Sequence, residues 1–197
     1  QGIGSDPRIG YQFIYPGAGY GGSGFPKDVR ALKHLAHAEG CEASILTAVH
    51  DTNQRQKNKL AERVMARLGA NLTGKTIAVW GLAFKPNTND IRYAPSIEMI
   101  ELILKNKGSV IAYDPIANDS MSHIFEHINY FSNIYDAVDG VDGLVVMTEW
   151  DEIKSLDLKK IKNIMNDNKV LDTRNIVKME HLSEYGFKYD NIGRMKL

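Results

Sequence analysis

The sequence predicts an α/β protein: a Rossmann-like, doubly wound parallel sheet preceded by a loop and long helices. Three observations predict this fold. From residue 76 onward, short apolar runs alternate with helical patterns, as they do where helices connect parallel strands. The runs are apolar throughout, which is typical of strands that are covered on both faces. Before residue 72 the chain instead holds a glycine-rich stretch and two helical patterns.

Residues 1–25 are predicted to form a glycine-rich loop. Five glycines fall within the eight positions 17–24. Such a run costs backbone entropy, and it is explained if the backbone takes positive φ values or approaches a bound group closely. A flexible linker is the alternative, but linkers rarely interleave aromatic residues with glycine. The aromatic residues here, which could wall a small-molecule pocket, are Phe13, Tyr15, Tyr20 and Phe25.

The spacing Gly17-x-Gly19-x-x-Gly22 matches the dinucleotide-binding fingerprint in its letters alone. That fingerprint requires a strand before it, then a helix and a second strand that ends in an acidic residue. Pro16 interrupts the lead-in, and two helices follow without a strand between them. We therefore reject this stretch as an NAD fingerprint.

Residues 26–71 are predicted to form two helices. Pro26 suits a first helical turn, and apolar residues follow at helical spacing up to Gly40. A second helix is expected from about Glu42 to Leu68, with a polar middle at residues 51–59. At 1.5 Å per residue it spans about 40 Å, more than a small domain can cover. We therefore expect a homodimer in which this helix packs against a second copy.

Residues 72–197 are predicted to form the sheet domain. The expected strands are residues 76–80, 109–113, 130–131, 143–147, 169–171 and 187–189. The expected helices are residues 95–107, closed by Gly108, then 121–127, 134–138, 158–165 and one near Glu180.

Ligands of such sheets bind beyond the carboxyl ends of the strands. The loops that leave the first and fifth predicted strands there carry Lys85, Arg92 and Arg174. Three cations at one edge suit a diphosphate, although solvated surface cations are the alternative. Asp114, at the end of the second strand, has the position of the ribose-binding acid in dinucleotide-binding sheets. The loop after the first strand, however, lacks the three glycines that accompany that acid.

Composition excludes several classes of function. Lysine plus arginine and aspartate plus glutamate number 24 each, so no basic surplus indicates nucleic acid. No apolar run is long enough for a membrane span, and a single cysteine suits a reducing cytoplasm. The scattered histidines and the lack of a Cys-rich pattern predict no metal site. Because the chain begins at Gln1 without a start methionine, we expect a fragment.

Four stretches resemble signatures of the UDP-glucose/GDP-mannose dehydrogenase family, and the resemblance runs along the whole chain. The first, residues 19–28, is similar to the active-site signature of the UDP-glucose 6-dehydrogenases within that family, with Gly24 where the family has its catalytic cysteine. The others are residues 81–85 with 90–92, residues 113–115 and residues 172–174. The resemblance implies the end of a central dimerisation region, residues 26–71, and a C-terminal domain that binds the UDP-sugar, residues 72–197. The family's N-terminal NAD domain has no counterpart here.

The resemblance also implies roles for individual residues. UDP-glucose is oxidised to UDP-glucuronate with two NAD, through a cysteine thiohemiacetal and thioester. Asp28 would orient or activate the hydrolytic water, Lys27 and Arg92 would contact NAD, and Arg8 would reach the sugar held by a neighbouring subunit. The remaining substrate-binding positions are Phe13, Ile14, Tyr15, Pro16, Gly17, Gly21, Phe25, Lys85 and Arg174.

Glycine has no side chain that could form a thioester, so we expect the chain as given to be inactive. Cys41 is expected to be a packed thiol on a helix, too far along the chain to replace the nucleophile. Gly24 fits an engineered change and a natural loss equally well. Two other functions stay open: a non-catalytic nucleotide-sugar-binding or dimerisation module, and a dehydrogenase of GDP-mannose or UDP-N-acetylmannosamine.

Overall fold

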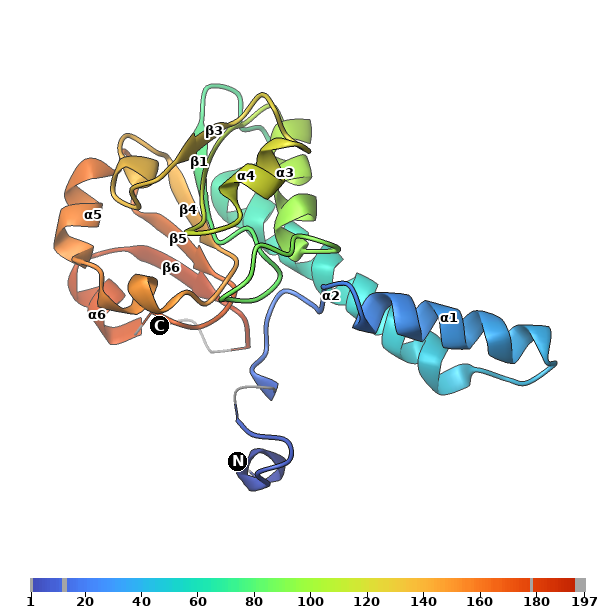
Figure 1. Cartoon of the computed structure of the whole chain (residues 1–197). Coiled ribbons are helices and arrows are strands. Elements are labelled where there is room, and N and C mark those ends of the chain that lie inside the picture. Colours follow the sequence, from blue (N-terminus) through green and yellow to red (C-terminus); the bar gives the residue numbers. More distant parts are fainter. Residues whose placement is uncertain (1, 12–13, 178, 194–197) are drawn as a thin grey trace.

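The computed structural model describes residues 2–11, 14–177 and 179–193 (Figure 1). The helices are α1 (Phe25–Ala38), α2 (Ser44–Leu68), α3 (Pro95–Lys105), α4 (Asn118–Ser122), α5 (Leu158–Ile164) and α6 (Met179–Glu184). The strands are β1 (Thr76–Trp80), β2 (Ser109–Tyr113), β3 (Asn129–Phe131), β4 (Gly143–Val146), β5 (Lys169–Asp172) and β6 (Lys188–Asn191). Short 3-10 helices lie at Ile3–Ser5, Asp136–Val138 and Asp151–Ser155.

The six strands form one parallel sheet in the order β3-β2-β1-β4-β5-β6. The strand order reverses on either side of β1, because the chain passes from β3 at one edge to β4 beside β1. This arrangement confirms the predicted doubly wound sheet. It also places the switch point, where ligands of such sheets bind, at the carboxyl ends of β1 and β4.

The sheet is covered on both faces, as the continuous apolar strands predict. Along β1, Ile77 and Val79 join the core on the side of α2 and α3, whereas Ala78 and Trp80 join the core on the side of α5 and α6. All four are fully buried. A parallel strand in this position has no face for a polar residue, which explains its unbroken apolar run.

The end of α3 differs from the prediction. The helix ends at Lys105, and the left-handed residue that follows is Lys107, with φ +66°. Gly108 is not the left-handed residue that ends the helix, although its amide donates to the Ile103 carbonyl at 3.0 Å. It packs where a Cβ would lie 2.8 Å from Ile103 and 3.0 Å from Leu72, so close packing, not a turn, explains this glycine.

Several other boundaries shift by a few residues. The helix expected at 121–127 begins earlier, as α4, because Asp114 and Asn118 organise the turn that follows β2. The helix expected at 134–138 is a 3-10 turn at Asp136–Val138, and Asp151–Ser155 forms a 3-10 helix that the sequence did not predict.

Helices α1 and α2 form a hairpin whose tip projects away from the sheet (Figure 1). The inner half of α2 joins the main core through Leu60, Val64 and Leu68, whereas α1 buries Val29 alone. Cys41 was expected on a helix as a packed thiol, and this was wrong. It lies exposed in the loop between the two helices, because Gly40, with φ +68°, has already ended α1.

Candidate functional site

The glycine segment, residues 17–24, lies across the carboxyl edge of the sheet. Gly22 donates its amide to the carbonyl of Arg92 at 2.7 Å, and the Phe84 ring packs directly against its Cα. At the other end of the segment, the Arg174 guanidinium lies so close to Gly17 that a Cβ there would collide with it. The segment therefore contacts both the loop after β1 and the loop after β5.

Polar side chains of α2 hold this segment in place. Asn53 accepts the Tyr20 amide at 2.8 Å and donates to the Tyr20 carbonyl at 3.2 Å, and Gln56 donates to the Gly17 carbonyl at 2.9 Å. Lys57, also buried, pairs with Glu98 of α3 at 2.6 Å. Polar residues in the middle of α2 thus bind the glycine segment of their own chain.

Sequence reasoning missed these anchors, although the sequence holds a signal for them. Asn53 and Lys57 continue the helical spacing of the buried residues Leu60, Val64 and Leu68 toward the N-terminus of α2. Polar residues that extend a buried stripe must find hydrogen-bond partners. Here the partners are backbone groups of a loop, which leave no periodic pattern of their own.

Position 24 differs from the other glycines of the segment. Gly24 has φ −89° and ψ −74°, a backbone conformation that any residue can adopt, and it caps α1 at its N-terminus. A Cβ built there meets only Asp28 Oδ2, at an ordinary 3.8 Å. A side chain therefore fits at position 24, and its first atom would lie beside the Asp28 carboxylate.

The three predicted cations have different partners. Arg174 is paired with Glu149 at 2.5 Å, and both side chains are largely buried. Arg92 binds Asp90 through two bonds of 2.9 and 2.8 Å, and this guanidinium holds the pKa of the Asp90 carboxyl below its usual value. Lys85 is exposed over the Phe84 ring and has no carboxylate partner in the described part of the chain.

The β5 exit loop is itself held by Asp172. This buried carboxylate accepts the amides of Arg174 and Val177, each at 2.9 Å. Thr173 binds the Val146 carbonyl through its hydroxyl at 2.8 Å. The three residues predicted as a signature therefore include two that shape the loop and one, Arg174, that faces the glycine segment.

Asp114 does not act as a ribose-binding acid. Its carboxylate accepts the amides of Leu82 and Ala83 after β1, of Ile116 and Ala117 after β2, and the indole N–H of Trp150. These five donors occupy both oxygens. Asp114 thus ties together the loops that leave β1, β2 and β4.

The remaining predicted residues differ in where they lie. Arg8 pairs with Asp6 at 2.7 Å in the N-terminal segment, which extends away from the sheet (Figure 1). Lys27 is exposed, 3.5 Å from the Asp28 carboxylate. The Phe25 ring meets the Tyr20 ring edge to face at 4.6 Å.

The predicted positions before and within the glycine segment are mostly exposed. Ile14, Tyr15 and Pro16 are exposed. The backbone of Gly21 packs against Tyr93, and Phe13 lies outside the described residues.

Residues 78–179 match the UDP-binding domain of the UDP-glucose/GDP-mannose dehydrogenase family, and residues 1–55 match the central domain of that family. The first of these matches covers more than half of the chain. The chain belongs to this family. Its members are NAD-dependent oxidoreductases of nucleotide sugars, so the cations at the sheet edge lie in the domain that the family uses for UDP.

One relative and two solved structures show how similar this chain is to other members of the family. A UDP-glucose 6-dehydrogenase of Pseudomonas aeruginosa is 42% identical over 200 residues, covering 98% of this chain and 44% of the relative. A UDP-glucose dehydrogenase structure from Pyrobaculum islandicum aligns with TM-score 0.78 at 30% identity, covering 96% of this chain and 41% of that one. A UDP-D-ManNAc dehydrogenase structure from Pyrococcus horikoshii aligns with TM-score 0.76 at 27% identity, covering 96% of this chain and 42% of that one. The chain spans less than half of each relative.

Two further observations concern the described residues. No three His, Cys, Asp or Glu side chains among them come together in a way that could hold a metal ion. None of the helices in this part of the chain is both long and apolar enough to cross a membrane.

Proposed function

We propose that this family member is the UDP-sugar-binding part of a UDP-glucose 6-dehydrogenase. The observation that carries the proposal is that the glycine segment contacts Phe84, whose ring Lys85 overlies, and Arg174, at the carboxyl edge of the sheet. A diphosphate needs cations that converge from rigid loops. We infer that Lys85 and Arg174, on the β1 and β5 exit loops, are these cations; Asp114 and Asp172 hold the two loops in place.

In this proposal the substrate extends along the glycine segment. Lys85 and Arg174 bind the diphosphate, and the backbone of residues 14–17 and 21 with the Phe25 ring shapes the pocket. The glucose C6 then lies toward position 24, where Asp28 is placed to orient a water molecule. NAD would accept a hydride there, and Lys27 and Arg92, both with exposed side chains, are the residues of this chain that would contact it.

We further propose that the chain as given does not oxidise UDP-glucose. Oxidation to the carboxylate through a thioester needs a thiolate at position 24, and Gly24 provides none. Cys41 lies at the far end of α1 from Gly24, so it does not replace the missing group. A Cβ at position 24 meets only an ordinary contact with Asp28, so the backbone there does not require glycine and a cysteine would fit.

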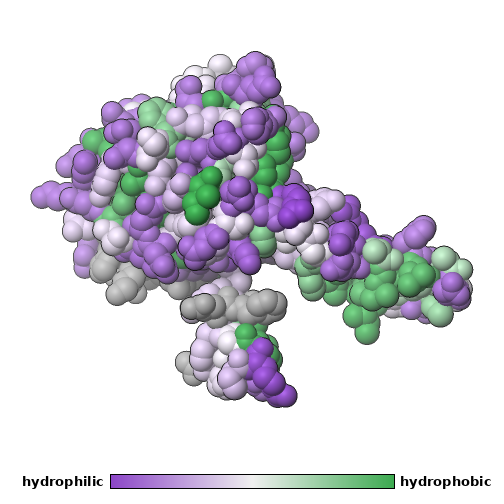
Figure 2. Space-filling view, in the orientation of Figure 1, coloured by the Kyte–Doolittle hydropathy of each residue, from purple (hydrophilic) through white to green (hydrophobic). Residues whose placement is uncertain are grey.

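We also propose a homodimer through the α1–α2 hairpin. The hairpin exposes Leu32, Leu35 and Ile45 by 52%, 56% and 79%, and Figure 2 shows apolar residues gathered along this projecting part. Apolar side chains that collect on one projecting element are typical of an interface. Arg8, in the extended N-terminal segment, would then reach the substrate of the second copy.

Calorimetric titration with UDP-glucose tests the proposal. We expect binding, and we expect Lys85→Ala and Arg174→Ala each to weaken it about tenfold or more, because each removes a charged hydrogen bond to phosphate. Lys159→Ala, an exposed lysine of α5, is the matched control and should leave the affinity unchanged. Lack of binding, or equal loss in the control, would contradict the proposal.

Two further measurements separate the alternatives. Incubation of the chain with UDP-glucose and NAD should give no NADH absorbance, and NADH formation by the chain alone would overturn the proposed inactivity. The resemblance to a UDP-D-ManNAc dehydrogenase makes other nucleotide sugars the second candidate. Titrations with UDP-N-acetylmannosamine and GDP-mannose, run beside UDP-glucose, rank the three substrates directly.

A further inference from the structure

We propose that Glu149 recognises the ribose of the bound nucleotide. One of its carboxylate oxygens binds Arg174, and the other accepts a hydrogen bond from a ribose hydroxyl. This inference rests on the proposed function, since it concerns the same UDP site. It adds a specificity residue that the sequence motifs did not indicate. Glu149 follows β4, at the switch point of the sheet.

Glu149 occupies a rigid position. The residue before it, Thr148, donates its hydroxyl to the Ala83 carbonyl at 2.6 Å, and the residue after it, Trp150, donates its indole N–H to Asp114 at 3.1 Å. Both neighbours are buried and fastened to the β1 exit loop or to Asp114. The Glu149 side chain therefore projects from a fixed backbone, as a residue that discriminates between ligands must.

The two oxygens of Glu149 are used differently. Oε1 accepts Arg174 Nη2 at 2.5 Å, and the same guanidinium packs against Gly17. Oε2 is enclosed and has no hydrogen-bond partner among the described residues. A carboxylate oxygen left in this way is a strong acceptor that lacks a donor. In this proposal the bound nucleotide displaces the side chains that enclose Oε2, and a ribose hydroxyl supplies the missing donor.

The position of Glu149 favours the ribose over the other hydroxyl-bearing part of the ligand. In the proposed function the reacting sugar carbon lies toward position 24, at one end of the glycine segment. Arg174 and Glu149 lie at the other end, beside Gly17. With the diphosphate held by Arg174, the group attached on this side is the nucleoside, and its ribose offers hydroxyl donors next to the phosphate.

A comparison of UDP with 2′,3′-dideoxy-UDP tests this inference. The dideoxy compound keeps the base and the diphosphate but lacks both ribose donors. We expect the wild-type chain to bind it at least about tenfold more weakly than UDP, as for a lost hydrogen bond to a charged group. In Glu149→Ala both ligands should bind more weakly, because Arg174 loses its partner, and the ratio of their dissociation constants should fall close to one.

The ratio separates contact from simple positioning. If Glu149 acts only by holding Arg174, the substitution weakens both ligands equally and the ratio stays at its wild-type value, which overturns the inference. UDP binding without discrimination in the wild type also overturns it. Absence of UDP binding overturns the proposed function as well. If Glu149 contacts the glucose instead, its replacement affects discrimination for UDP-glucose analogues alone, and the ribose assignment is wrong.

The variant must be folded for this comparison. Its far-UV circular dichroism and urea midpoint should be measured first. Should Glu149→Ala not fold, Glu149→Gln keeps the shape of the side chain while removing the charge that holds Arg174. It should still reduce the discrimination between UDP and 2′,3′-dideoxy-UDP, and unchanged discrimination would contradict the inference.

Discussion

At the scale of single residues, two glycines of the same segment differ in backbone conformation and in the space available for a side chain. Gly22 has φ +88°, and the ring of Phe84 fills the space that a Cβ would need. Gly24, two residues on, has an ordinary helical backbone, and a Cβ there finds only Asp28 Oδ2 within 4 Å. Glycine is thus structurally required at position 22 and is unnecessary at position 24.

The two positions should therefore respond differently to alanine. Gly22→Ala is expected to lower the free energy of unfolding by about 2 kcal/mol or more, through the strained φ and the clash with Phe84. Gly24→Ala should leave it unchanged or raise it by about 0.4–1 kcal/mol, because alanine restricts the unfolded chain. Urea unfolding of both variants and the parent chain checks this, and equal destabilisation would contradict a glycine requirement confined to position 22.

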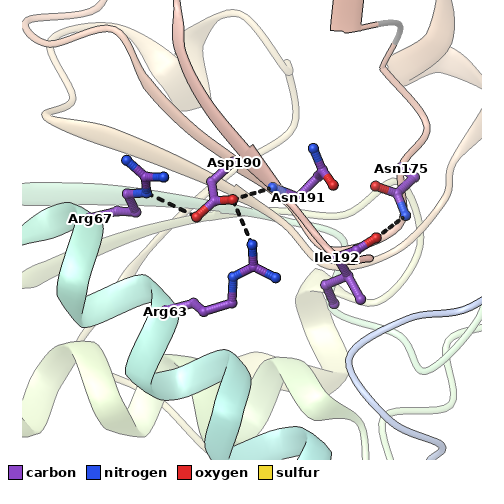
Figure 3. A network of polar contacts seen from close by, with 6 residues as sticks. All are labelled: Arg63, Arg67, Asn175, Asp190, Asn191 and Ile192. Atoms are coloured by element: carbon purple, nitrogen blue, oxygen red, sulfur yellow. Dashed lines mark hydrogen bonds and ion pairs between the residues drawn. The ribbon is translucent and has the colours of Figure 1, made fainter. Parts of the chain in front are cut away.

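At the scale of elements, one carboxylate fastens α2 to the last strand. Asp190 of β6 accepts Arg63 Nη2 and Arg67 Nε, each at 2.9 Å, and also the amide of Asn191 (Figure 3). Burial alone would raise the pKa of Asp190. The hydrogen bond from Arg67, the Asn191 amide and the charges of both arginines outweigh it and hold the pKa below its usual value.

The contribution of Asp190 should depend on pH. A carboxyl whose folded pKa is depressed stabilises the fold above its unfolded pKa of about 3.8, and this stability is lost as pH falls through the lower folded value. At pH 7, Asp190→Asn should lower the free energy of unfolding by about 1–2 kcal/mol, a modest figure because both arginines are partly exposed. Urea unfolding at pH 7 and near pH 3 should show the difference shrinking with acid; a constant difference would rule out linkage.

The tether between α2 and the glycine segment gives a second prediction at this scale. Asn53→Ala removes both bonds to Tyr20, and we expect a loss of about 1–2 kcal/mol in stability and faster hydrogen exchange of the Tyr20 amide. Asn58→Ala, at an exposed position of the same helix, is the matched control. If both variants exchange alike at Tyr20, then Asn53 does not hold the segment.

At the scale of the whole molecule, the chain consists of a covered sheet and a hairpin that reaches out from it. The sheet has apolar cores on both faces, whereas α1 has almost no core of its own. A helix of this kind derives little stability from its own propensity and needs tertiary packing to persist. A second copy of the chain would supply that packing, which is the physical basis of the proposed dimer.

Replacing Leu32 and Leu35 together by glutamate tests the dimer. Both side chains are more than half exposed in the single chain, so the change should not disturb the fold of a monomer. We expect sedimentation velocity to show a dimer for the parent chain and a monomer for the double variant. Lys159→Glu, distant on α5, should leave the dimer intact. A parent chain that is monomeric at high micromolar concentration would contradict the homodimer proposal.

The sequence by itself determined the sheet and its ligand edge. Apolar runs set β1, β2 and β4 almost to the residue, since strands buried on both faces admit no polar interruption. Because all strands are parallel, the cations after β1 and β5 had to lie at one edge. The family signatures predicted the glycine segment, Lys85 and Arg174 as parts of one site, and the contact of Gly17 with Arg174 is consistent with it.

Only the tertiary structure decided which polar groups are used within the fold and which face the ligand. Asp114 resembled a ribose-binding acid in the sequence but is occupied by five protein donors. Glu149 belongs to no sequence motif, yet one of its oxygens has no hydrogen-bond partner among the described residues. Asn53 and Gln56 act on a loop more than thirty residues away. Hydrogen-bond partners depend on distance in space. Apolar periodicity depends on neighbours along the chain, so it does not predict these partners.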